Sequence, residues 1–401
     1  MKCLAPMVEG SEYPFRQLVS HFGVTHFWSP MYNVTMLKSN EKQIQQIIRT
    51  IKQENRNIIV QLAGNNPNDF EEIIAKLKVV KNIEYFDLNL GCAQVCAQRG
   101  NFGSYLMEER DIIQKILQVY SNNQVQISVK TRIFSSIDKT KDFIEFLIKN
   151  NVTMITLHGR LSKLKLGCFS GDALMQDTVT LLKDMQKKYV YVKFIYNGGI
   201  YSYNQVEHLN QMGIGAMSAQ IILQNPMLMT PQESFPILDQ YWYDKFEQFN
   251  LDQNILQDIK YNEIQSFDIT NLYLSVSNDK QNLVIKKQVV PMLFDTKQQR
   301  INRIKACYLF CHYCEYASQN NLEVTISCVL SISMSLFGRD FLKYQTDLRD
   351  QIVQKDYSHI TDHERIMKRC QIIKTICQEA VKRLMDNKGF QKHNYQKIDE
   401  K

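Results

Sequence analysis

The sequence lacks the features that mark membrane and secreted proteins. Its 401 residues contain no apolar run of the roughly 18 residues that a membrane-spanning helix requires. The best candidate, residues 326–337, is shorter and carries four serines. The first residues run straight into an apolar stretch and show no secretory signal pattern. Ten cysteines in such a chain are expected to be reduced thiols, so we expect a protein of the cytoplasm or the nucleus.

Several nucleotide-binding and metal-binding motifs are absent as well. No G-x-G-x-x-G follows the first apolar run, which argues against a Rossmann fold, and neither a Walker A loop nor H-E-x-x-H occurs. One C-x-x-C is present, but it has no second pair of ligands of the kind a tetrahedral zinc site needs. Because Cys307, Cys311 and Cys314 recur at helical spacing, we expect them to pack against a core, and we expect no metal.

The sequence also has only a small excess of positive charge. The net charge is +7. Residues 1–227 hold 25 Lys+Arg against 19 Asp+Glu, and residues 228–401 hold 23 against 22. This surplus is compatible with an anionic partner but does not identify one, and it does not place such a partner on the second half of the chain.

What the sequence does contain is a regular alternation of apolar runs and amphipathic stretches over its first 220 residues. Parallel sheets covered by helices are built from such alternation. Eight repeats in this length favour a closed (β/α)8 barrel, or TIM barrel, over an open sheet. We expect the strands at residues 3–7, 25–28, 58–62, 83–90, 125–129, 154–157, 189–196 and 214–218.

Polar residues and glycines follow nearly every one of these runs. In barrels of this type the carboxyl ends of the strands form the active site. One such residue alone is more often a satisfied structural group than a ligand. Their recurrence at barrel spacing therefore predicts a functional site at this end of the barrel. The candidate segments are 5–7, 29–31, 61–64, 89–92, 130–132, 158–160, 197–199 and 218–220.

The segment 87–106 carries the most informative of these strand ends. Its apolar run stops at Gly91, Cys92 follows at once, and a loop with Gly100 and Gly103 leads to an acidic helix start. Cys92 has two readings, since free cysteine also packs as a small buried hydrophobe. A thiol immediately past a strand end is equally well placed for catalysis.

The motifs resemble a known family. In order and spacing, APM, QLAG, LNLGC, VKTR, HGR and NGG across residues 3–227 are similar to those of the tRNA-dihydrouridine synthases, most closely the eukaryotic branch named for tRNA positions 16 and 17. Three departures stand out. Ala93 replaces the proline that usually follows the cysteine, Leu161 replaces a threonine, and Ala219 with Gln220 replaces a Gly-Arg pair of bacterial members.

The resemblance implies an FMN-dependent enzyme that reduces the C5=C6 bond of a D-loop uridine in tRNA, with NADPH or NADH as a transient reductant. Cys92 is implied to be the proton donor. Asn89, Arg99 and Arg160 are implied to contact the substrate. The residues implied to bind the flavin are Pro6, Met7, Val8, Gln61, Lys130, His158, Asn197, Gly198, Gly199, Ala219 and Gln220.

The chain changes character after the barrel. We expect residues 1–231 to be the catalytic domain, 232–296 a polar insertion or linker, 297–387 an all-helical domain and 388–401 a polar tail. Residues 365–384 have one apolar face, and basic residues occupy much of the other, which is either a solvated surface or, as the resemblance implies, part of a tRNA-binding domain. The basic residues are Arg365, Lys368, Arg369, Lys382 and Arg383.

Two other functions remain open at this point. One is a flavin oxidoreductase that acts on a free pyrimidine, although such a substrate needs no second domain. The other is a tRNA-binding or tRNA-folding protein that keeps the fold with a weakened site. Neither the modified uridine nor the oligomeric state follows from the residues.

Overall fold

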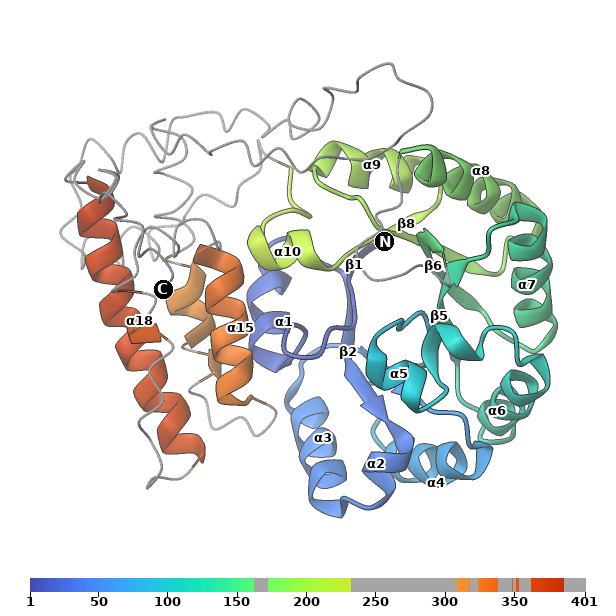
Figure 1. Cartoon of the computed structure of the whole chain (residues 1–401), viewed down its shortest axis with the longest axis horizontal. Helices are drawn as coiled ribbons and strands as arrows, with labels where there is room; N and C mark the ends of the chain where they lie inside the picture. The colour runs from blue at the N-terminus through green and yellow to red at the C-terminus, as the bar shows by residue number, and fades with distance from the viewer. Residues whose placement is uncertain are drawn as a thin grey trace, which may run out of the picture.

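The computed structural model describes residues 1–161 and 172–231, and beyond them 307, 309–314, 316–317, 324–337, 348, 351–352 and 362–385. Eight parallel strands form a closed barrel in which each strand pairs with its neighbours in sequence and β1 pairs with β8 (Figure 1). The TIM-barrel prediction is therefore confirmed. The strands are β1 Lys2–Leu4, β2 His26–Asn33, β3 Ile58–Ala63, β4 Ile83–Leu90, β5 Ile127–Ile133, β6 Met154–Leu161, β7 Lys193–Asn197 and β8 Gly215–Ser218.

Helices surround the barrel on its outside, one or more after each strand (Figure 1). The longer helices bury an apolar stripe in the core, as α3 does with Ile44, Ile47 and Ile51. The helices of the barrel are α1 Tyr13–Ser20, α2 Val34–Lys38, α3 Glu41–Gln53, α4 Pro67–Leu77, α5 Val95–Arg99, α6 Arg110–Asn122, α7 Ile137–Lys149, α8 Asp172–Lys188, α9 Tyr203–Gln211 and α10 Gln220–Gln224, with a 3-10 turn, η1, at Gly103–Leu106.

Three strands extend several residues beyond their apolar runs, among them β6, which was expected to end at residue 157 and ends at Leu161. β5 continues from Val129 to Ile133, and β2 continues to Asn33 with a shift of register between Trp28 and Met31. In β5 the added residues include the polar Lys130 and Arg132, so an apolar run cannot reveal the full length of the strand. β7 is shorter than expected and begins at Lys193.

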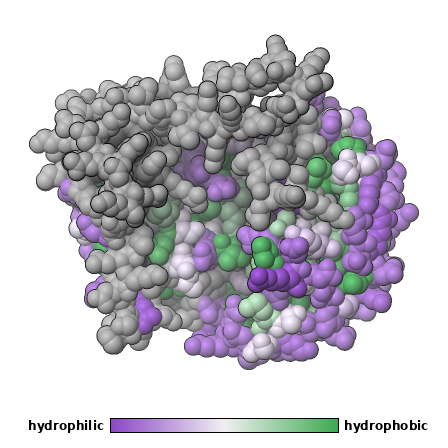
Figure 2. All heavy atoms as spheres, in the orientation of Figure 1, coloured by the Kyte–Doolittle hydropathy of each residue, from purple (hydrophilic) through white to green (hydrophobic). Residues whose placement is uncertain are grey.

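The barrel interior is apolar at one level and polar above it. Cys3, Trp28, Ile59, Met154 and Ile195 belong to one buried cluster inside the barrel. In the view of Figure 2 the outer helices are mostly hydrophilic, and hydrophobic residues show toward the middle of the barrel face. The polar level lies toward the carboxyl ends of the strands, which is where the predicted site residues are.

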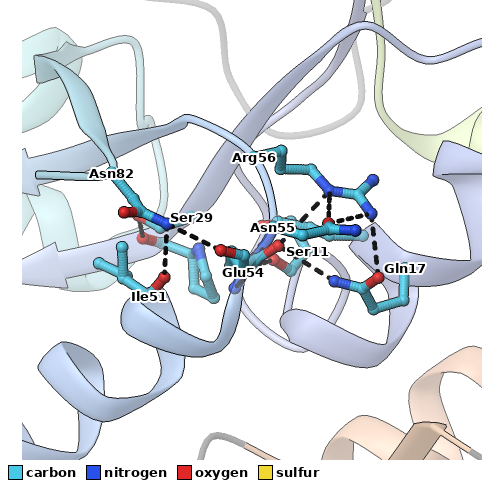
Figure 3. Close-up of polar contacts among 10 residues, drawn as sticks. Ser11, Gln17, Ser29, Ile51, Glu54, Asn55, Arg56 and Asn82 are labelled. Carbon is cyan, nitrogen blue, oxygen red and sulfur yellow. Dashed lines mark hydrogen bonds and ion pairs between the residues drawn. The ribbon is translucent and has the colours of Figure 1, made fainter.

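A buried ion pair between Arg16 and Glu54 connects α1 to the segment between α3 and β3; Figure 3 labels Glu54 and its neighbours Gln17 and Arg56. Arg16 donates through Nε to Glu54 Oε1 at 2.7 Å, and both side chains are fully buried. Gln17 Nε2 donates to the second carboxylate oxygen of Glu54 at 3.2 Å. Arg16 also donates to the backbone oxygen of Ser11. Since the pair is dry, its loss would leave an uncompensated charge inside the protein.

Nearly all of the described residues after 306 are helical, and they pack beside α1 and α10 (Figure 1). They include α15 (Ile326–Phe337) and α18 (Asp362–Met385). His21, at the end of α1, stacks on Tyr316 and hydrogen-bonds to its hydroxyl at 2.8 Å. Helical segments thus follow the barrel, as expected. The predicted insertion, residues 232–296, and the predicted tail, residues 388–401, lie outside the described residues.

The cysteines of the C-x-x-C region pack as predicted. Cys307, Cys311 and Cys314 are buried and face α18, where they contact Cys370 and Cys377. Within the residues that the structure describes, no three or more His, Cys, Asp or Glu side chains are grouped to hold a metal ion. The same residues include no helix long and apolar enough to cross a membrane.

The basic face expected on α18 needs one correction. Arg369 is only 2% exposed, and its guanidinium donates to the backbone oxygens of Gln351 at 3.2 Å and Ile352 at 2.7 Å. It therefore holds two segments together and does not belong to a solvent-facing basic surface. Lys368 remains exposed. Arg369 lies three residues after Ile366 and four before Ile373, so helical periodicity places it on the buried apolar face, one step away from Lys368.

Candidate active site at the carboxyl end of the barrel

Cys92 lies two residues past the end of β4, in a loop held from both sides. Its backbone N–H donates to Asn89 Oδ1 at 2.9 Å. Its carbonyl oxygen accepts hydrogen bonds from the backbone N–H of Ser104 at 2.8 Å and from the Ser104 hydroxyl at 3.0 Å. Both backbone ends of Cys92 are therefore fixed, and the side chain is half-buried.

Gly103 allows the backbone of η1 to come close enough for the two hydrogen bonds from Ser104 to the Cys92 carbonyl, which we call the clasp. Its φ is +65°, a conformation that residues with a Cβ rarely adopt. A Cβ at this position would lie 2.5 Å from the carbonyl oxygen of Cys92 and 2.9 Å from its Cβ. The glycine therefore allows η1 to approach the thiol-bearing residue closely. Gly91, the first glycine of the segment, has room for a Cβ, whose nearest neighbour would be 3.4 Å away.

The environment of Cys92 favours the protonated thiol. Burial raises the pKa of Cys92 above its ordinary value, and the charges of Arg132 and Lys130 lower it only in part. A thiol of raised pKa remains protonated at neutral pH, so it can give up a proton but is a poor nucleophile. This is the state that a general acid requires.

A chain of hydrogen bonds runs from the barrel interior to this loop. Ser128 Oγ donates to Asp87 Oδ1 at 2.6 Å, and Gln61 Nε2 donates to Asp87 Oδ2 at 2.7 Å. Asn89 Nδ2 donates to Gln61 Oε1 at 2.8 Å. Asn89 Oδ1 then accepts from the backbone N–H of Gly91, at 3.1 Å, and from that of Cys92. Four strand residues thus connect β5, β4 and β3 to the cysteine.

Asp87 is the buried acid of this chain. Its side chain has no exposed surface. Burial raises the pKa of Asp87 to about 6, although the hydrogen bonds from Ser128 and Gln61 and the charge of Lys130 hold it down. The carboxylate is therefore mainly ionised at neutral pH and accepts from both neighbours.

Three cations and a neutral histidine line the neighbouring strands β5 and β6. Burial lowers the pKa of Lys130 to about 8, with a further decrease caused by Arg132 and Arg160, while Asp87 and Cys92 raise it. Burial also lowers the pKa of His158 well below its ordinary value, and the same three cations add to that shift. Three positive charges this close to one another make a site suited to an anion.

Arg132 also serves the cysteine loop directly. Its Nε donates to the carbonyl oxygen of Gly91 at 2.6 Å, and its Nη1 donates to that of Leu161 at 3.3 Å. The side chain thus bridges the loop after β4 and the last residue of β6.

The loops after β7 and β8 offer a glycine-rich backbone. Asn197 is 4% exposed and donates to the Met217 carbonyl at 2.9 Å, which ties β7 to β8. Gly198 has φ +114°, and a Cβ there would meet His158 at 2.9 Å. Gly199 has φ +61°. Ala219 precedes α10, and Gln220, its first residue, is exposed.

The other predicted residues vary in their distance from this centre. Met7 is held by Ser11, whose hydroxyl accepts from the Met7 N–H at 2.9 Å and donates to its carbonyl at 3.1 Å. Pro6 and Val8 flank it, and Val8 is 65% exposed. Arg99 is an exposed residue at the end of α5, away from the buried chain of hydrogen bonds.

The comparisons with known proteins agree with this architecture. The family model described as "Dihydrouridine synthase (Dus)" matches residues 3–298, which is more than half of the chain. The chain belongs to the dihydrouridine synthase family. The matched residues begin within β1 and extend past β8, so they include Cys92 and the strand ends around it.

Dihydrouridine synthases of eukaryotes are among the similar sequences. The tRNA-dihydrouridine(16/17) synthase of Schizosaccharomyces pombe is 31% identical over 247 residues, which cover 60% of this chain and 59% of that protein. The mouse protein of that name with the suffix "-like" is 32% identical over 229 residues, covering 56% and 46%. The Saccharomyces cerevisiae tRNA-dihydrouridine(16/17) synthase is 30% identical over 231 residues, covering 56% and 53%. The chain spans about half the length of these relatives.

Among solved structures, a truncated 3-deoxy-D-arabino-heptulosonate 7-phosphate synthase from Thermotoga maritima matches with a TM-score of 0.37 and 11% identity, over 62% of this chain and 87% of that one.

Within this member of the dihydrouridine synthase family, sequence reasoning gave no role to several residues that shape the site. Asp87, Ser128 and Arg132 lie inside strands, where an apolar run draws attention to its hydrophobic members. The strand alternation that places Lys130 in the interior also places Ser128 and Arg132 there, two residues to either side. The two-residue period of the strand could therefore have revealed Ser128 and Arg132 from the sequence.

Proposed function

We propose that the chain is a tRNA-dihydrouridine synthase that reduces the C5=C6 bond of a D-loop uridine, with FMN as cofactor and NADPH or NADH as the source of electrons. Membership of the dihydrouridine synthase family and the names of its relatives support this proposal. The observation that carries it is the position of Cys92, a protonated thiol clamped at the end of β4 beside a group of cations.

The residues present fit a flavin phosphate and an anionic ring. In addition to burial, the charges of Arg132 and Arg160 lower the pKa of Lys130, and the charge of Arg160 lowers that of Arg132; a bound anion would relieve these effects. Gly198 and Gly199 leave the backbone open where a Cβ would obstruct an approaching group. When bound, the flavin supplies the hydride that a neutral pyrimidine cannot obtain from any side chain.

We infer that the phosphate end is held by backbone N–H groups at Asn197, Gly198 and Gly199 and by the start of the segment Ala219–Gln220. Met7, with its neighbours Pro6 and Val8, would line the opposite loop. Lys130 would offset the negative charge of the reduced ring. His158 is neutral, so it contributes hydrogen bonds and not charge to this neighbourhood.

Cys92 would act as the general acid. As hydride adds to C6 of the uracil, the Cys92 thiol gives its proton to C5, and the resulting thiolate takes a proton from solvent. Arg132 and Lys130 would stabilise that thiolate between turnovers. The substitution of Ala93 for proline leaves the loop geometry to Asn89, Ser104 and Arg132, whose hydrogen bonds hold it.

The substrate is a nucleotide that must leave its stack to reach the barrel mouth. This unstacking costs a few kcal/mol, and the cost is least where the loop is already unpaired. We infer that Arg160, inside the mouth, and Arg99, on its rim, contact the tRNA. Positions 16 and 17 are the expected targets because the relatives carry that name.

The test uses the purified full chain with NADPH and a tRNA transcript. We expect a yellow protein that releases FMN on denaturation and adds two hydrogens to a D-loop uridine, mapped by mass spectrometry. A colourless protein that fails to take up FMN yet still binds tRNA would contradict the enzyme and support the tRNA-binding alternative. Equal reduction of free uridine would support the free-pyrimidine alternative.

A further inference from the structure

The hydrogen-bond chain that ends at Cys92 has a direction set by a single residue. A carboxylate can only accept hydrogen bonds, whereas the two ends of an amide have similar shapes and opposite roles. Asp87 accepts at both oxygens, so it forces Gln61 to present its NH2 group toward Asp87. The Gln61 oxygen is then left for Asn89, and Asn89 in turn presents its oxygen to the Cys92 loop.

Water cannot substitute for any member of this chain. Asp87 is 0% exposed, Gln61 1% and Asn89 7%. A donor that faced a donor here would remain unsatisfied at the full cost of a buried polar group. The orientation of each amide is therefore dictated by its neighbour, beginning from the carboxylate.

We propose that Asp87 is a positioning residue for Cys92, which it controls through the orientation of Gln61 and Asn89. Asp87 lies inside β4, beneath the loop, and reaches Cys92 only through the two amides. The consequence for proton donation rests on the proposed function, but the consequence for the position of the thiol does not.

Exchange of one carboxylate and one amide tests the proposal at almost constant shape and charge. In Asn89→Asp, Gln61 would face a carboxylate on each side, and its oxygen would have to oppose one of them. In the double variant Asp87→Asn with Asn89→Asp, Gln61 can turn over. The new amide at position 87 would then donate to the Gln61 oxygen, and Gln61 would donate to the new carboxylate at position 89. That carboxylate would still accept from the Cys92 N–H.

The single variant Asp87→Asn should be mild. Its amide can donate to the Ser128 hydroxyl while its oxygen continues to accept from Gln61. Asp87→Asn should thus have little effect alone but restore the Asn89→Asp variant. A simple loss of packing does not produce this pattern, whereas a directional chain of hydrogen bonds does.

The readout is the rate at which iodoacetamide alkylates Cys92 in flavin-free protein at pH 8, followed by peptide mass spectrometry with exposed Cys96 as the internal reference. We expect about tenfold faster alkylation of Cys92 in Asn89→Asp, because one unsatisfied buried hydrogen bond loosens the loop by about that factor. Asp87→Asn should stay within about twofold, and the double variant should return close to the starting rate.

Asp69→Asn is the matched control, since Asp69 is also a buried carboxylate, bonded to Thr35 and Lys38 outside the site. It should lower thermal stability and leave Cys92 alkylation unchanged. Equal rates in Asn89→Asp and the double variant, or damage by Asp87→Asn equal to that of Asn89→Asp, would overturn the proposal. If the chain forms no dihydrouridine but the double variant restores the alkylation rate of Cys92, the proposed function fails and the positioning role of Asp87 stands. If the chain forms dihydrouridine but the double variant restores nothing, the positioning role fails and the proposed function stands.

Discussion

The carbonyl oxygen of Cys92 accepts two hydrogen bonds from Ser104, one from the backbone at 2.8 Å and one from the hydroxyl at 3.0 Å. With Asn89 bound to its N–H, Cys92 can move only at its side chain. The proposed chemistry therefore depends on where the loop is held as much as on the thiol itself, and the variants below separate these two contributions.

The first prediction concerns the thiol. Cys92→Ala should leave flavin content and NADPH-driven flavin reduction unchanged and reduce dihydrouridine formation roughly 10²–10⁴-fold, the usual loss on removing a general acid. Cys96→Ala, an exposed cysteine four residues further on, is the matched control and should be nearly silent. An essential Cys96 and a dispensable Cys92 would refute the assignment of the proton donor.

Gly103→Ala tests the clasp without touching the thiol. The new Cβ would meet the Cys92 carbonyl at 2.5 Å in a backbone conformation with φ +65°, so the loop must shift. We expect a loss of stability of about 1–2 kcal/mol and a roughly 10²-fold slower reduction of tRNA. Gly213→Ala has φ +76° but no atom closer than 3.8 Å to its Cβ, so it should reduce stability alone. Equal activity of the two variants would argue against the clasp.

Lys130→Met should have opposite effects on cofactor binding and on the stability of flavin-free protein. The lowered pKa of Lys130, about 8, means that the folded protein disfavours the charged amine. That penalty is full below pH 8 and disappears as pH rises toward the unfolded value of about 10.4. We expect the flavin-free variant to be about 1–2 kcal/mol more stable at pH 7, with a smaller gain at pH 10, and to retain little flavin. Denaturant unfolding at both pH values, with flavin content measured by absorbance, decides it.

Glu54→Gln should be one of the costliest conservative substitutions in the barrel. Arg16 would remain buried opposite a neutral amide, which typically costs about 3–5 kcal/mol. The midpoint of urea unfolding measures this loss. Glu41→Gln removes an exposed partner of Lys76 and should have little effect on the midpoint. If both variants behave alike, the Arg16–Glu54 pair does not support α1 as described.

The tRNA contact predicted for α18 loses Arg369, which is buried, whereas Arg365 is half-buried and Lys368 is exposed. Lys368→Glu should weaken tRNA binding and lower the slope of log affinity against log salt by about 0.7–0.9, the effect of one lost phosphate contact. Lys187→Glu, on α8, is an exposed control that should leave the slope unchanged. An unchanged slope in the Lys368 variant would move the RNA site to the rim of the barrel, where the charge surplus lies.

The fold was largely readable from the sequence, and the particular residues show why. Strands β3 and β4 coincide with apolar runs because both of their faces are buried for most of their length. β5 was predicted to end at Val129 because Lys130 and Arg132 point into a barrel mouth that is polar. An apolar run therefore indicates the full length of a strand only where both faces of that strand are buried.

The candidate site was less complete. Cys92 could be found because a motif marks it, but its support could not, because Asp87 and Ser104 act through contacts between segments distant in sequence. Gly91 attracted attention as the glycine before the cysteine, whereas Gly103 is the one whose conformation is demanding. Arg369 was assigned to the wrong surface because its charge was given more weight than the helical period, which places it with Ile366 and Ile373 on the buried face.

The register of β4 also limits how the length of this chain can vary. Asp87 is paired with Gln61 and Ser128, and Asn89 with Lys130, so both side chains point inward at a spacing of two. A single inserted residue between them would turn Asn89 toward the outer helices and disconnect the cysteine loop. Insertions and deletions should therefore be tolerated at the amino-terminal end of β4, in the turn at residues 78–82, and rejected at its carboxyl-terminal end.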